Sequence, residues 1–457
     1  MHLKKLMRIN SSSKADAVLA LWILGLLVLN FFADRTSFGL LSLWSFLAFA
    51  TYFLLTGAVE WTEKRVNQLI LAGLLMRLLS VFAFPRLSDD IYRFFWDGSL
   101  SLNGISPFAF LPRYIFDSGM LSGATDPTLF ENLNSKDYYS VYPPVCQFVF
   151  AAAYVLSPKS IYGFAVLLKA FLFCCECGTL YYLKRMNVGP KNLLIYALNP
   201  LLVLEMCGNA HFEAAMLFFF VAALYHLNVH NSKEQKPQIL LGALLIALSV
   251  ASKLLTLIFL PFLLRHLGWK KSVGLVLLMT LFSTLLFAPF YDDHFIAHFM
   301  SSVSLYFQNF EFNASFYYMF KWVGNAIYGY TPAQLIAAFS NLLFLGGGAL
   351  LFFSKRDFFS AAFLLATIYL LLQRAVHPWY ICTLVLLSTF VPWRYGILWS
   401  GLVMLSYSHY HQNIYHENSV LLFVEYVVLF GFMFRELFFT DNRLTVHALF
   451  DRIRNRQ

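Results

Sequence analysis

Long apolar runs, each close to the length of one membrane crossing, constrain this chain more than any other feature. Three of them, at 17–32, 40–58 and 69–84, follow one another at its start. Hydrocarbon cannot hydrogen-bond a peptide group, so a run that crosses a bilayer must form a helix of about 20 residues. The composition agrees, because 12 % of residues are charged, against about 25 % in soluble proteins. We therefore predict an all-α polytopic integral membrane protein, with about 12 to 14 transmembrane helices at that length per crossing.

Basic residues near the ends of these runs predict the orientation. Residues 1–16 are basic, as are several short loops and the tail 436–457. Basic loops stay in the cytoplasm, so both termini are expected there and the third run should deliver the loop 85–144 to the outer face. One run, either 145–156 or 162–183, must be re-entrant for the crossings to alternate. No soluble domain is visible, and residues 1–457 are predicted to form one polytopic membrane domain.

The outer loop centres on the sequence SDDIYRFFWDG, residues 88–98. Asp89 and Asp90 follow the end of a membrane helix, where a carboxylate can meet a lipid-borne donor and an aqueous acceptor. Low-dielectric surroundings make a carboxylate a better base. The structural alternative is that the pair caps a helix beginning at Ile91, since Asp is a favoured N-cap.

Two aromatic residues, a cation and a third acid follow this pair. Aromatic faces beside carboxylates suit a sugar ring, which has an apolar C–H face and a rim of hydroxyls. The alternative is a helix that lies in the membrane interface and is anchored by Tyr and Trp. The four residues are Tyr92, Arg93, Trp96 and Asp97.

Ionisable residues within the apolar runs form a second candidate set. Such groups are costly in a membrane and indicate function by default, and phosphate is a natural partner for Lys253 and Arg374. Snorkelling to the interface is the alternative for Lys253. Arg77 and Glu205 could instead form structural pairs.

His211 and Glu213 follow a helix broken at Asn199 and Pro200. A lone histidine is more often structural, yet two residues from an acid, at an expected outer helix end, His211 could contact an acceptor hydroxyl or a phosphate.

Neither a metal nor a nucleic acid is expected as a partner. The six cysteines lie in or beside apolar runs, where cysteine acts as a small hydrophobic residue. Asp89 and Asp90 could hold a divalent ion, but spacing fixes no further ligand, so we favour no metal. The net charge of +9 is explained by cytoplasmic anchoring.

Several segments resemble polyprenyl-phosphate-mannose-dependent mannosyltransferases, which belong to the C-type superfamily of membrane glycosyltransferases. The resemblance covers residues 69–386. It implies an all-helical fold, a catalytic aspartate on an outer-face loop, a lipid-phosphate sugar donor and inversion at the anomeric carbon. The segments, in the family's order, are SDDIYRFFWDG, NGISPF, YSVYPP, ALNPLLVLEMCGNAH, ASKLLTLIFLP, FNASFYYMF and VHPWY.

Carried onto this chain, the family's loop aspartate matches Asp90, with Asp89 as the alternative. Lys253, Arg374 and His377 match positions expected to face the lipid phosphate. The family's polar segment after the broken helix is only partly kept, because Phe212 and Glu213 replace its usual polar pair. The set proposed to bind sugar or acceptor is Tyr92, Arg93, Trp96, Asp97, Tyr142, His211 and Glu213.

The resemblance predicts a hexosyltransferase, with mannose as the expected sugar. Its partners would be a polyprenyl-phosphate sugar, a glycan or glycolipid acceptor and membrane lipid. We expect it in a bacterial inner membrane with the active site facing outward. The alternative is a polytopic transporter or lipid flippase for a glycolipid, but transporters often carry inverted repeats, and no repeat is visible in this sequence.

Overall fold

The computed structural model describes residues 12–57, 62–120, 126–230, 235–308, 310–413 and 416–439. Across these ranges the regular structure is helical, apart from one parallel bridge between Phe312 and Ala375. The prediction of an all-α fold is confirmed. The basic residues Lys4, Lys5 and Arg8 and most of the tail 436–457 lie outside the described residues, so the cytoplasmic placement of the termini stays a prediction.

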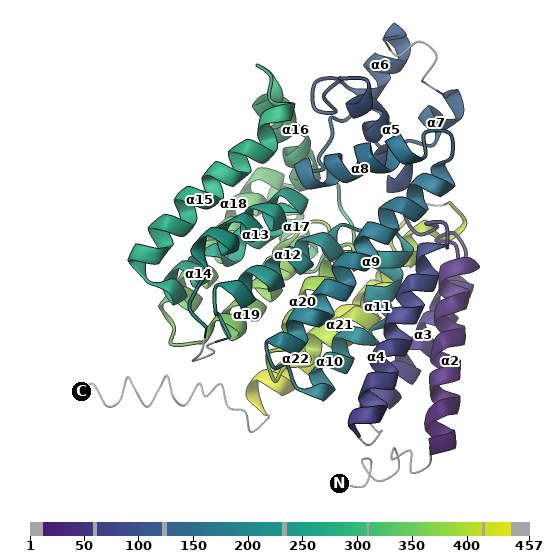
Figure 1. Cartoon of the computed structure of the whole chain (residues 1–457), viewed down its shortest axis with the longest axis vertical. Helices are drawn as coiled ribbons and strands as arrows, with labels where there is room; N and C mark the ends of the chain where they lie inside the picture. Colours follow the sequence, from purple (N-terminus) through teal and green to yellow (C-terminus); the bar gives the residue numbers. More distant parts are fainter. Residues whose placement is uncertain are drawn as a thin grey trace.

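Helices from the start of the chain form one flank of the molecule (Figure 1). They are α2 (Ser12–Phe31), α3 (Phe38–Gly57) and α4 (Glu63–Val81), and α9 (Ile161–Arg185) packs against α4.

A buried ion pair locks α4 to α9. Arg77 Nε lies 2.8 Å from Glu176, and the guanidinium also donates to the Ala197 carbonyl at 2.5 Å. Neither side chain of the pair is exposed. A buried charge is tolerated when it is paired and hydrogen-bonded, so Arg77 has a structural role, and its partner is Glu176 rather than Glu205.

The loop 85–144 forms a cap at one end of the molecule, and α2 begins and α22 ends at the opposite end (Figure 1). The cap contains α5 (Asp90–Leu102), α6 (Pro112–Ser118) and α7 (Pro127–Glu131), and α8 (Pro144–Leu156) follows it. The α5 helix packs closely on α8 at Gly98, where an added Cβ would lie 2.7 Å from the Phe150 carbonyl oxygen. With 13 residues, α8 is shorter than a crossing needs, as expected for a run that does not cross.

The middle of the chain is broken where it approaches the cap. The segment comprises α10 (Pro190–Ala197), α11 (Pro200–Leu202), the π-helix η1 (Val203–Gly208) and α12 (Glu213–His226), with a bend of 111° between Gly208 and Glu213. Asn199 starts the second part, because its side-chain oxygen accepts from the Leu201 amide at 3.0 Å while Pro200 occupies the first helical position.

A second break separates α13 (Ile239–Ser252) from the 3-10 helix η2 (Leu254–Phe259). Lys253 lies between them with extended backbone, at φ −158° and ψ 136°. The chain continues through α14 (Leu260–Leu267), α15 (Trp269–Phe287) and η3 (Ala288–Phe290).

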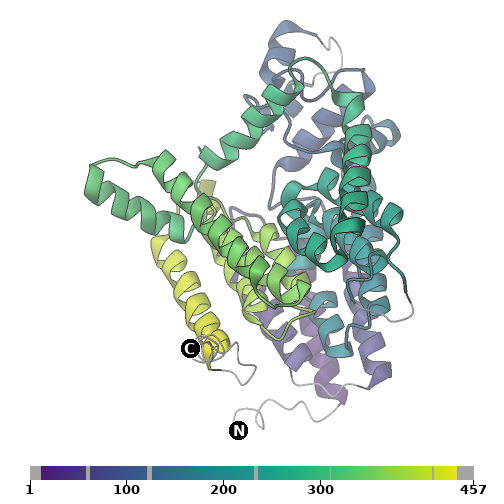
Figure 2. The same ribbon diagram turned by 90° about the vertical axis from the view of Figure 1, so that its left-hand side faces the viewer.

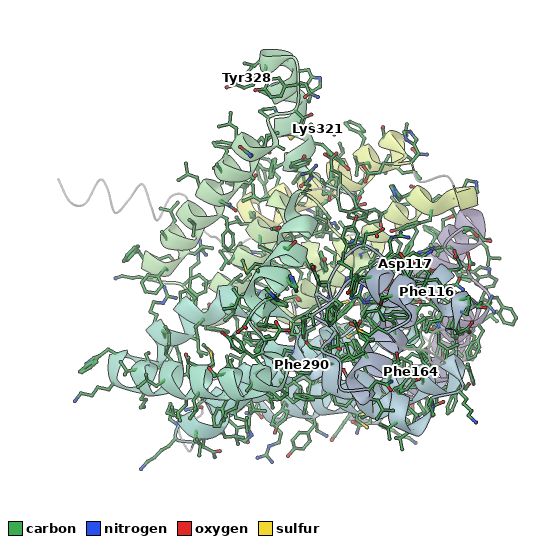
Figure 3. All side chains as sticks on the ribbon, turned by 90° about the horizontal axis from the view of Figure 1, so that it is seen from above. Phe116, Asp117, Phe164, Phe290, Lys321 and Tyr328 are labelled. Carbon is green, nitrogen blue, oxygen red and sulfur yellow. The ribbon has the colours of Figure 1, made fainter. Side chains whose placement is uncertain are left out.

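The C-terminal part begins with α16 (Phe295–Gln308) and α17 (Phe316–Tyr328), and α17 stands away from the body (Figure 2). Seen from above, Tyr328 at the end of α17 lies at the margin of the molecule, far from Asp117 in the cap (Figure 3). In chain order, the elements of the whole C-terminal part are α16 (Phe295–Gln308), α17 (Phe316–Tyr328), α18 (Ala333–Phe353), α19 (Phe358–Leu372), η4 (Pro378–Ile381), α20 (Cys382–Leu387), α21 (Tyr395–Leu402), η5 (Val403–Asn413) and α22 (Ser419–Phe438).

The number of candidate crossings is lower than the sequence suggested. Five helices of the described chain are long and apolar enough to cross a membrane, and the bent segment could supply a sixth, against an expected 12 to 14. Several apolar runs fold as shorter helices, such as α13 with 14 residues and α19 with 15. The two numbers differ because an apolar run in the sequence is not always one continuous helix, and the shorter apolar helices are not among these five. The five are Ser13–Phe31, Phe38–Gly57, Ile161–Arg185, Trp269–Phe290 and Ala333–Phe353.

Candidate active site

A cavity of about 840 Å³ lies where the cap meets both breaks, which is within the size range of small-molecule sites. Six of the residues predicted from the sequence line it: Asp89, Asp90, Tyr142, His211, Lys253 and His377. Residues from the start, middle and end of the chain therefore share one site.

The two aspartates at the start of α5 have different partners. Asp89 forms an ion pair with Arg35, which comes from the turn between α2 and α3. Asp90 accepts a hydrogen bond from the Asn134 side chain at 2.8 Å, and among the described residues this is the partner of its carboxylate. Capping does not explain the pair, because Asp89 makes no side-chain cap bond and the Asp90 amide instead donates to Ser88 Oγ at 3.3 Å.

Further along α5, Arg93 and Asp97 do not line the cavity and instead hold the cap together. Arg93 Nε lies 2.7 Å from Asp97, and the guanidinium also donates to the carbonyls of Ser135 and Tyr138, both at 2.9 Å. Asp97 is fully buried and accepts from Ser140 Oγ at 2.5 Å. These contacts fix the return of the loop toward α8.

Tyr92 and Trp96, the two aromatic residues of α5 predicted to bind sugar, also lie behind the cavity wall, whereas Phe94 lines the cavity. Trp96 is buried against Phe130, with ring centroids 6.1 Å apart, and Tyr92 lies against Phe84. Neither lines the cavity. Of the six residues of SDDIYRFFWDG predicted to form the site, the two aspartates thus line the cavity and the other four lie behind its wall.

The bend before α12 brings His211 to the cavity. His211 Nε2 lies 3.2 Å from Glu205, which also accepts from the Tyr407 hydroxyl at 2.6 Å. Ala210 has a positive φ of 65°, a conformation that non-glycine residues rarely adopt. Nearby, the Asn209 side chain accepts from the Leu87 amide at 3.1 Å and so ties the bend to the start of the loop 85–144.

At the second break, Lys253 lies between an acid and an aromatic ring. Its amino group pairs with Glu213, whose side chain is 2 % exposed, and lies 5.2 Å from the centroid of the Tyr380 ring. The Lys253 side chain is 29 % exposed and reaches the cavity, whereas Glu213 does not line it. Glu213 therefore orients and balances the cation that faces the cavity.

A series of nearly parallel rings forms another wall. Trp379 stacks on His211 at 3.8 Å and on His377 at 4.4 Å, and His377 in turn stacks on Phe312 at 4.8 Å. Burial, together with the positive charges nearby, lowers the pKa of His377 to about 3. The ring is therefore neutral at ordinary pH and can contact a ligand as a hydrogen-bonding group rather than as a cation.

Arg374 lies just outside the cavity. It contacts Glu311 at 2.9 Å, and Glu311 also pairs with Lys321 at 2.7 Å. A backbone bond links the two segments, since the Phe312 amide donates to the Arg374 carbonyl at 3.2 Å. Arg374 thus supports the segment that carries His377, and the structure does not bring it to the cavity.

Several cavity residues were not singled out from the sequence. Arg35, Asn134, His409 and Tyr410 line the same space as the two aspartates, and Trp379 and Tyr380 form its ring wall. Arg35 lies 5.1 Å above the Tyr410 ring. Trp379 and Tyr380 could have been predicted as site residues, because they belong to the VHPWY segment that carries the family resemblance. Arg35 could not, because its partners lie far along the chain and no local sequence pattern indicates them.

No group of three or more His, Cys, Asp or Glu side chains is placed to hold a metal ion in the part of the chain that the structure describes.

Comparison with known families identifies the chain. The family model described as "Alpha-(1->6)-mannopyranosyltransferase, N-terminal domain" matches residues 7–268, which is more than half of the 457 residues and includes Asp89, Asp90, His211 and Lys253. No curated protein and no solved structure matches. The match confirms the resemblance seen in the sequence, the C-type glycosyltransferase fold and the enzyme class of mannosyltransferase. This chain belongs to the alpha-(1->6)-mannopyranosyltransferase family.

Proposed function

We propose that the enzyme moves mannose from a polyprenyl-phosphate donor to a hydroxyl of a glycan or lipid-linked acceptor, with inversion at the anomeric carbon. The family supports mannose and an α-(1→6) product. Because inversion exchanges the two anomers, an α-linked product requires a β-linked donor. The observation that carries the proposal is that two aspartates and a lysine from distant parts of the chain line one cavity of about 840 Å³.

Asp90 is the proposed general base. Its carboxylate faces the cavity and is held by a neutral amide, Asn134 at 2.8 Å, whereas Asp89 is engaged by the Arg35 guanidinium. An uncompensated carboxylate is the better proton acceptor of the two. Asp89 remains the alternative base and otherwise fixes the start of α5.

The reaction is a single displacement. The acceptor oxygen bonds to the anomeric carbon as the bond from that carbon to the phosphate oxygen breaks, and the acceptor proton passes to Asp90. The polyprenyl phosphate leaves with one additional negative charge. Phosphate is already a good leaving group, so the step requires no general acid and no second carboxylate as nucleophile, in contrast to retaining glycosidases.

Lys253 is proposed to hold the leaving phosphate, because it is the lysine that reaches the cavity and Glu213 orients it. A preorganised cation placed where charge develops lowers the barrier. His377 contributes as a neutral hydrogen-bonding group. Arg374 acts indirectly, through the bridge that joins Phe312 to Ala375.

The ring wall and Tyr142 are proposed to bind the sugar and the acceptor. Trp379 offers an aromatic face between two histidines, and Tyr142 lies across α5 with its ring 4.8 Å from that of Phe94. Of the residues first assigned to the sugar, Tyr92, Arg93, Trp96 and Asp97 are proposed instead to support the cap. The site is proposed to face outward from a bacterial inner membrane, with membrane lipid around the helices and no metal cofactor.

A transfer assay tests this proposal. Membranes containing the wild type, Asp90→Asn, Asp89→Asn or Asp117→Asn receive radiolabelled polyprenyl-phosphate-mannose and a broad acceptor extract, at matched protein levels. Asp117→Asn is the control, because Asp117 is an exposed acid of the same cap outside the cavity. Loss with Asp90→Asn alone supports the assignment, and loss with Asp89→Asn alone moves the base by one residue. A wild type that transfers no label contradicts the proposal and favours the glycolipid transporter.

A further inference from the structure

A second cavity, of about 1180 Å³, lies at the other end of α9. The 25 residues of α9 span about 37 Å at 1.5 Å per residue, which exceeds the roughly 30 Å hydrocarbon core of a bilayer. The first turn of α9 is next to the cap, where the Tyr162 hydroxyl donates to the Phe82 carbonyl at 3.0 Å. The last residues, Lys184 and Arg185, line the second cavity. It therefore lies at the membrane face opposite the catalytic cavity.

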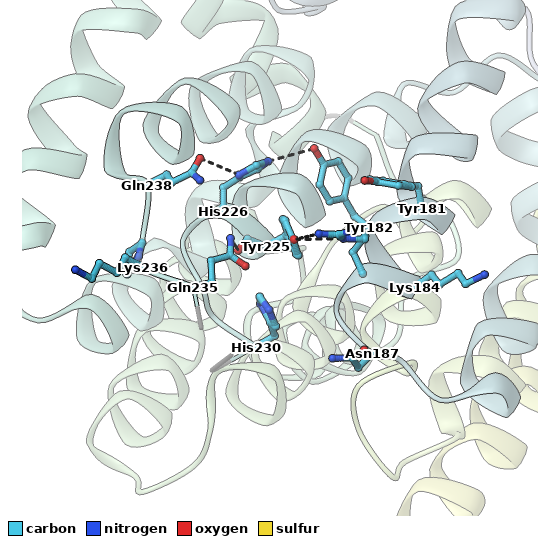
Figure 4. A pocket seen from close by; sticks show the side chains of 12 residues that line it. Tyr181, Tyr182, Lys184, Asn187, Tyr225, His226, His230, Gln235, Lys236 and Gln238 are labelled. Carbon is cyan, nitrogen blue, oxygen red and sulfur yellow. Dashed lines mark hydrogen bonds between the residues drawn. The ribbon is translucent and has the colours of Figure 1, made fainter. Parts of the chain in front are cut away.

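Positive charge gathers in this second cavity. Lys184 and Arg185 at the end of α9 line one side of it and Lys236, which precedes α13, lines the other, and no acidic side chain is among the described residues that line it (Figure 4). Favourable contact with the helix dipole would explain cations in the last turn of α9. It does not explain Lys236, which lies outside any helix.

The polar groups of this cavity are held in place by one another. Arg185 donates to the Tyr225 hydroxyl at 2.8 Å, and the His226 ring is held by the Tyr182 hydroxyl and the Gln238 side chain, both at 3.2 Å (Figure 4). Such bonds preorganise the site and reduce the entropy lost when a ligand binds.

One buried ring nitrogen in the cavity lacks a hydrogen bond. His230 stacks on Tyr225, with ring centroids 5.2 Å apart and planes at 9°. Its Nδ1 atom is buried and has no hydrogen-bond partner among the described residues. A buried polar atom without a partner costs about 1 to 3 kcal/mol, and a ligand oxygen would remove that cost.

We propose that this second cavity binds the phosphate group of an anionic ligand at the membrane face remote from catalysis. Arginine and lysine supply the charge that phosphate requires, and tyrosines suit the interfacial depth. The ligand is either the headgroup of an anionic phospholipid or a water-soluble phosphate. The proposal does not depend on the transfer reaction.

The test uses the purified full chain in lipid nanodiscs. The midpoint of thermal unfolding and the lipid retained in native mass spectrometry are measured in phosphatidylcholine alone, in phosphatidylcholine with phosphatidylglycerol, and in phosphatidylcholine with inorganic phosphate. The pocket variant is Lys184→Gln/Arg185→Gln/Lys236→Gln. The matched control, Lys270→Gln/Lys271→Gln/Lys355→Gln, removes the same charge from exposed positions outside the cavity.

The wild type and the control should be stabilised by phosphatidylglycerol if the ligand is a lipid, or by inorganic phosphate if it is soluble. The pocket variant should bind either probe at least about tenfold more weakly, since each basic residue contributes about 1 kcal/mol near an anionic surface. If the pocket variant fails to fold, His230→Ala and Lys236→Gln, which keep the Arg185–Tyr225 bonds, should each show a smaller loss. Equal responses of pocket variants and control, or no response of the wild type to either probe, overturn the proposal.

Discussion

Two acidic side chains lie about two turns apart on α5, and their surroundings differ. Asp90 is half-buried on the cavity wall and has an exposed neutral amide as its partner. Asp97 is fully buried and is held by Arg93, Ser140 and Gln147. The same residue type is thus proposed as the base at the start of α5 and as a stabilising group two turns later, and its partners rather than its place in a motif distinguish the two roles.

The largest expected effect is the loss of mannosyl transfer when Asp90, the acid of α5 that lines the cavity, is replaced. Asp90→Asn keeps the size of the side chain and removes the base, so we expect mannosyl transfer to fall by about 10² to 10⁴, the usual contribution of a general base. The midpoint of thermal unfolding should not change. A variant that retains wild-type turnover would show that Asp90 is not the base.

Replacing Asp97, the buried acid of α5, should lower stability rather than mannosyl transfer. Asp97→Ala leaves the Arg93 guanidinium buried without its carboxylate, and breaking a buried ion pair costs about 3 to 5 kcal/mol. We expect a lower unfolding midpoint in detergent, with transfer per folded molecule largely kept. If Asp97→Ala instead lowers turnover without affecting unfolding, the two turns of α5 do not divide the roles as proposed.

Lys253 is proposed to combine a role in the reaction with a role in stability, and a double variant separates the two. Lys253→Gln should raise the KM for the donor by about tenfold or more, since a hydrogen bond to a charged group contributes about 1.5 to 3 kcal/mol, and should also destabilise the fold by leaving Glu213 buried and unpaired. Lys253→Gln/Glu213→Gln should restore the unfolding midpoint but not the KM. Lys159→Gln, at an exposed position on the cap side, is the control. Recovery of both quantities in the double variant would rule out a phosphate contact.

The smallest expected effect is a pH dependence of stability that comes from Glu311, whose contact with Arg374 supports the segment that carries His377. Burial raises the pKa of Glu311, but hydrogen bonds from Lys321 and Tyr317 and the charge of Arg374 outweigh it, so the pKa falls below its ordinary value of 4.5. A lowered pKa adds stability above pH 4.5 that is lost as the pH falls through the folded value. The loss should be below about 1 kcal/mol, as for partly exposed pairs.

The measurement is the unfolding midpoint of the wild type and Glu311→Gln between pH 3 and pH 7, a range of about four units around the ordinary carboxyl pKa. The difference between the two proteins should shrink as the pH falls. A difference that stays constant with pH would mean that the Glu311 charge does not support this segment.

Much of the fold class could be predicted from the sequence, because apolar runs without alternation leave only helices as a solution in a membrane. The number of crossings could not, since hydropathy does not show where a run is interrupted. Lys253 illustrates this: it looked like a cation in the middle of a span, but it lies where α13 ends and the backbone becomes extended.

Part of the site was also predictable. Asp89, Asp90, His211, Lys253 and His377 reach the same cavity, because ionisable residues are rare in apolar runs and therefore conspicuous. In the sequence, Arg93 and Asp97 look like site residues just as Asp89 and Asp90 do. The hydrogen bonds that hold them behind the cavity wall come from residues some forty to fifty positions away. Arg35 meets Asp89 across 54 positions, a separation at which local patterns carry no information.

The row of rings from His211 through Trp379 and His377 to Phe312 connects three separate interruptions of the helical framework: the bend before α12, the segment before η4 and the segment before α17. Close-packed groups transmit strain, so we expect these three segments to move together when any one of them is displaced. We therefore expect the cavity to change shape, as an acceptor enters and a product leaves, mainly at the opposing wall, where Glu131, Asn132 and Asn134 are exposed. Asn134 of that wall donates the hydrogen bond to Asp90, so such a change would also move the partner of the proposed base.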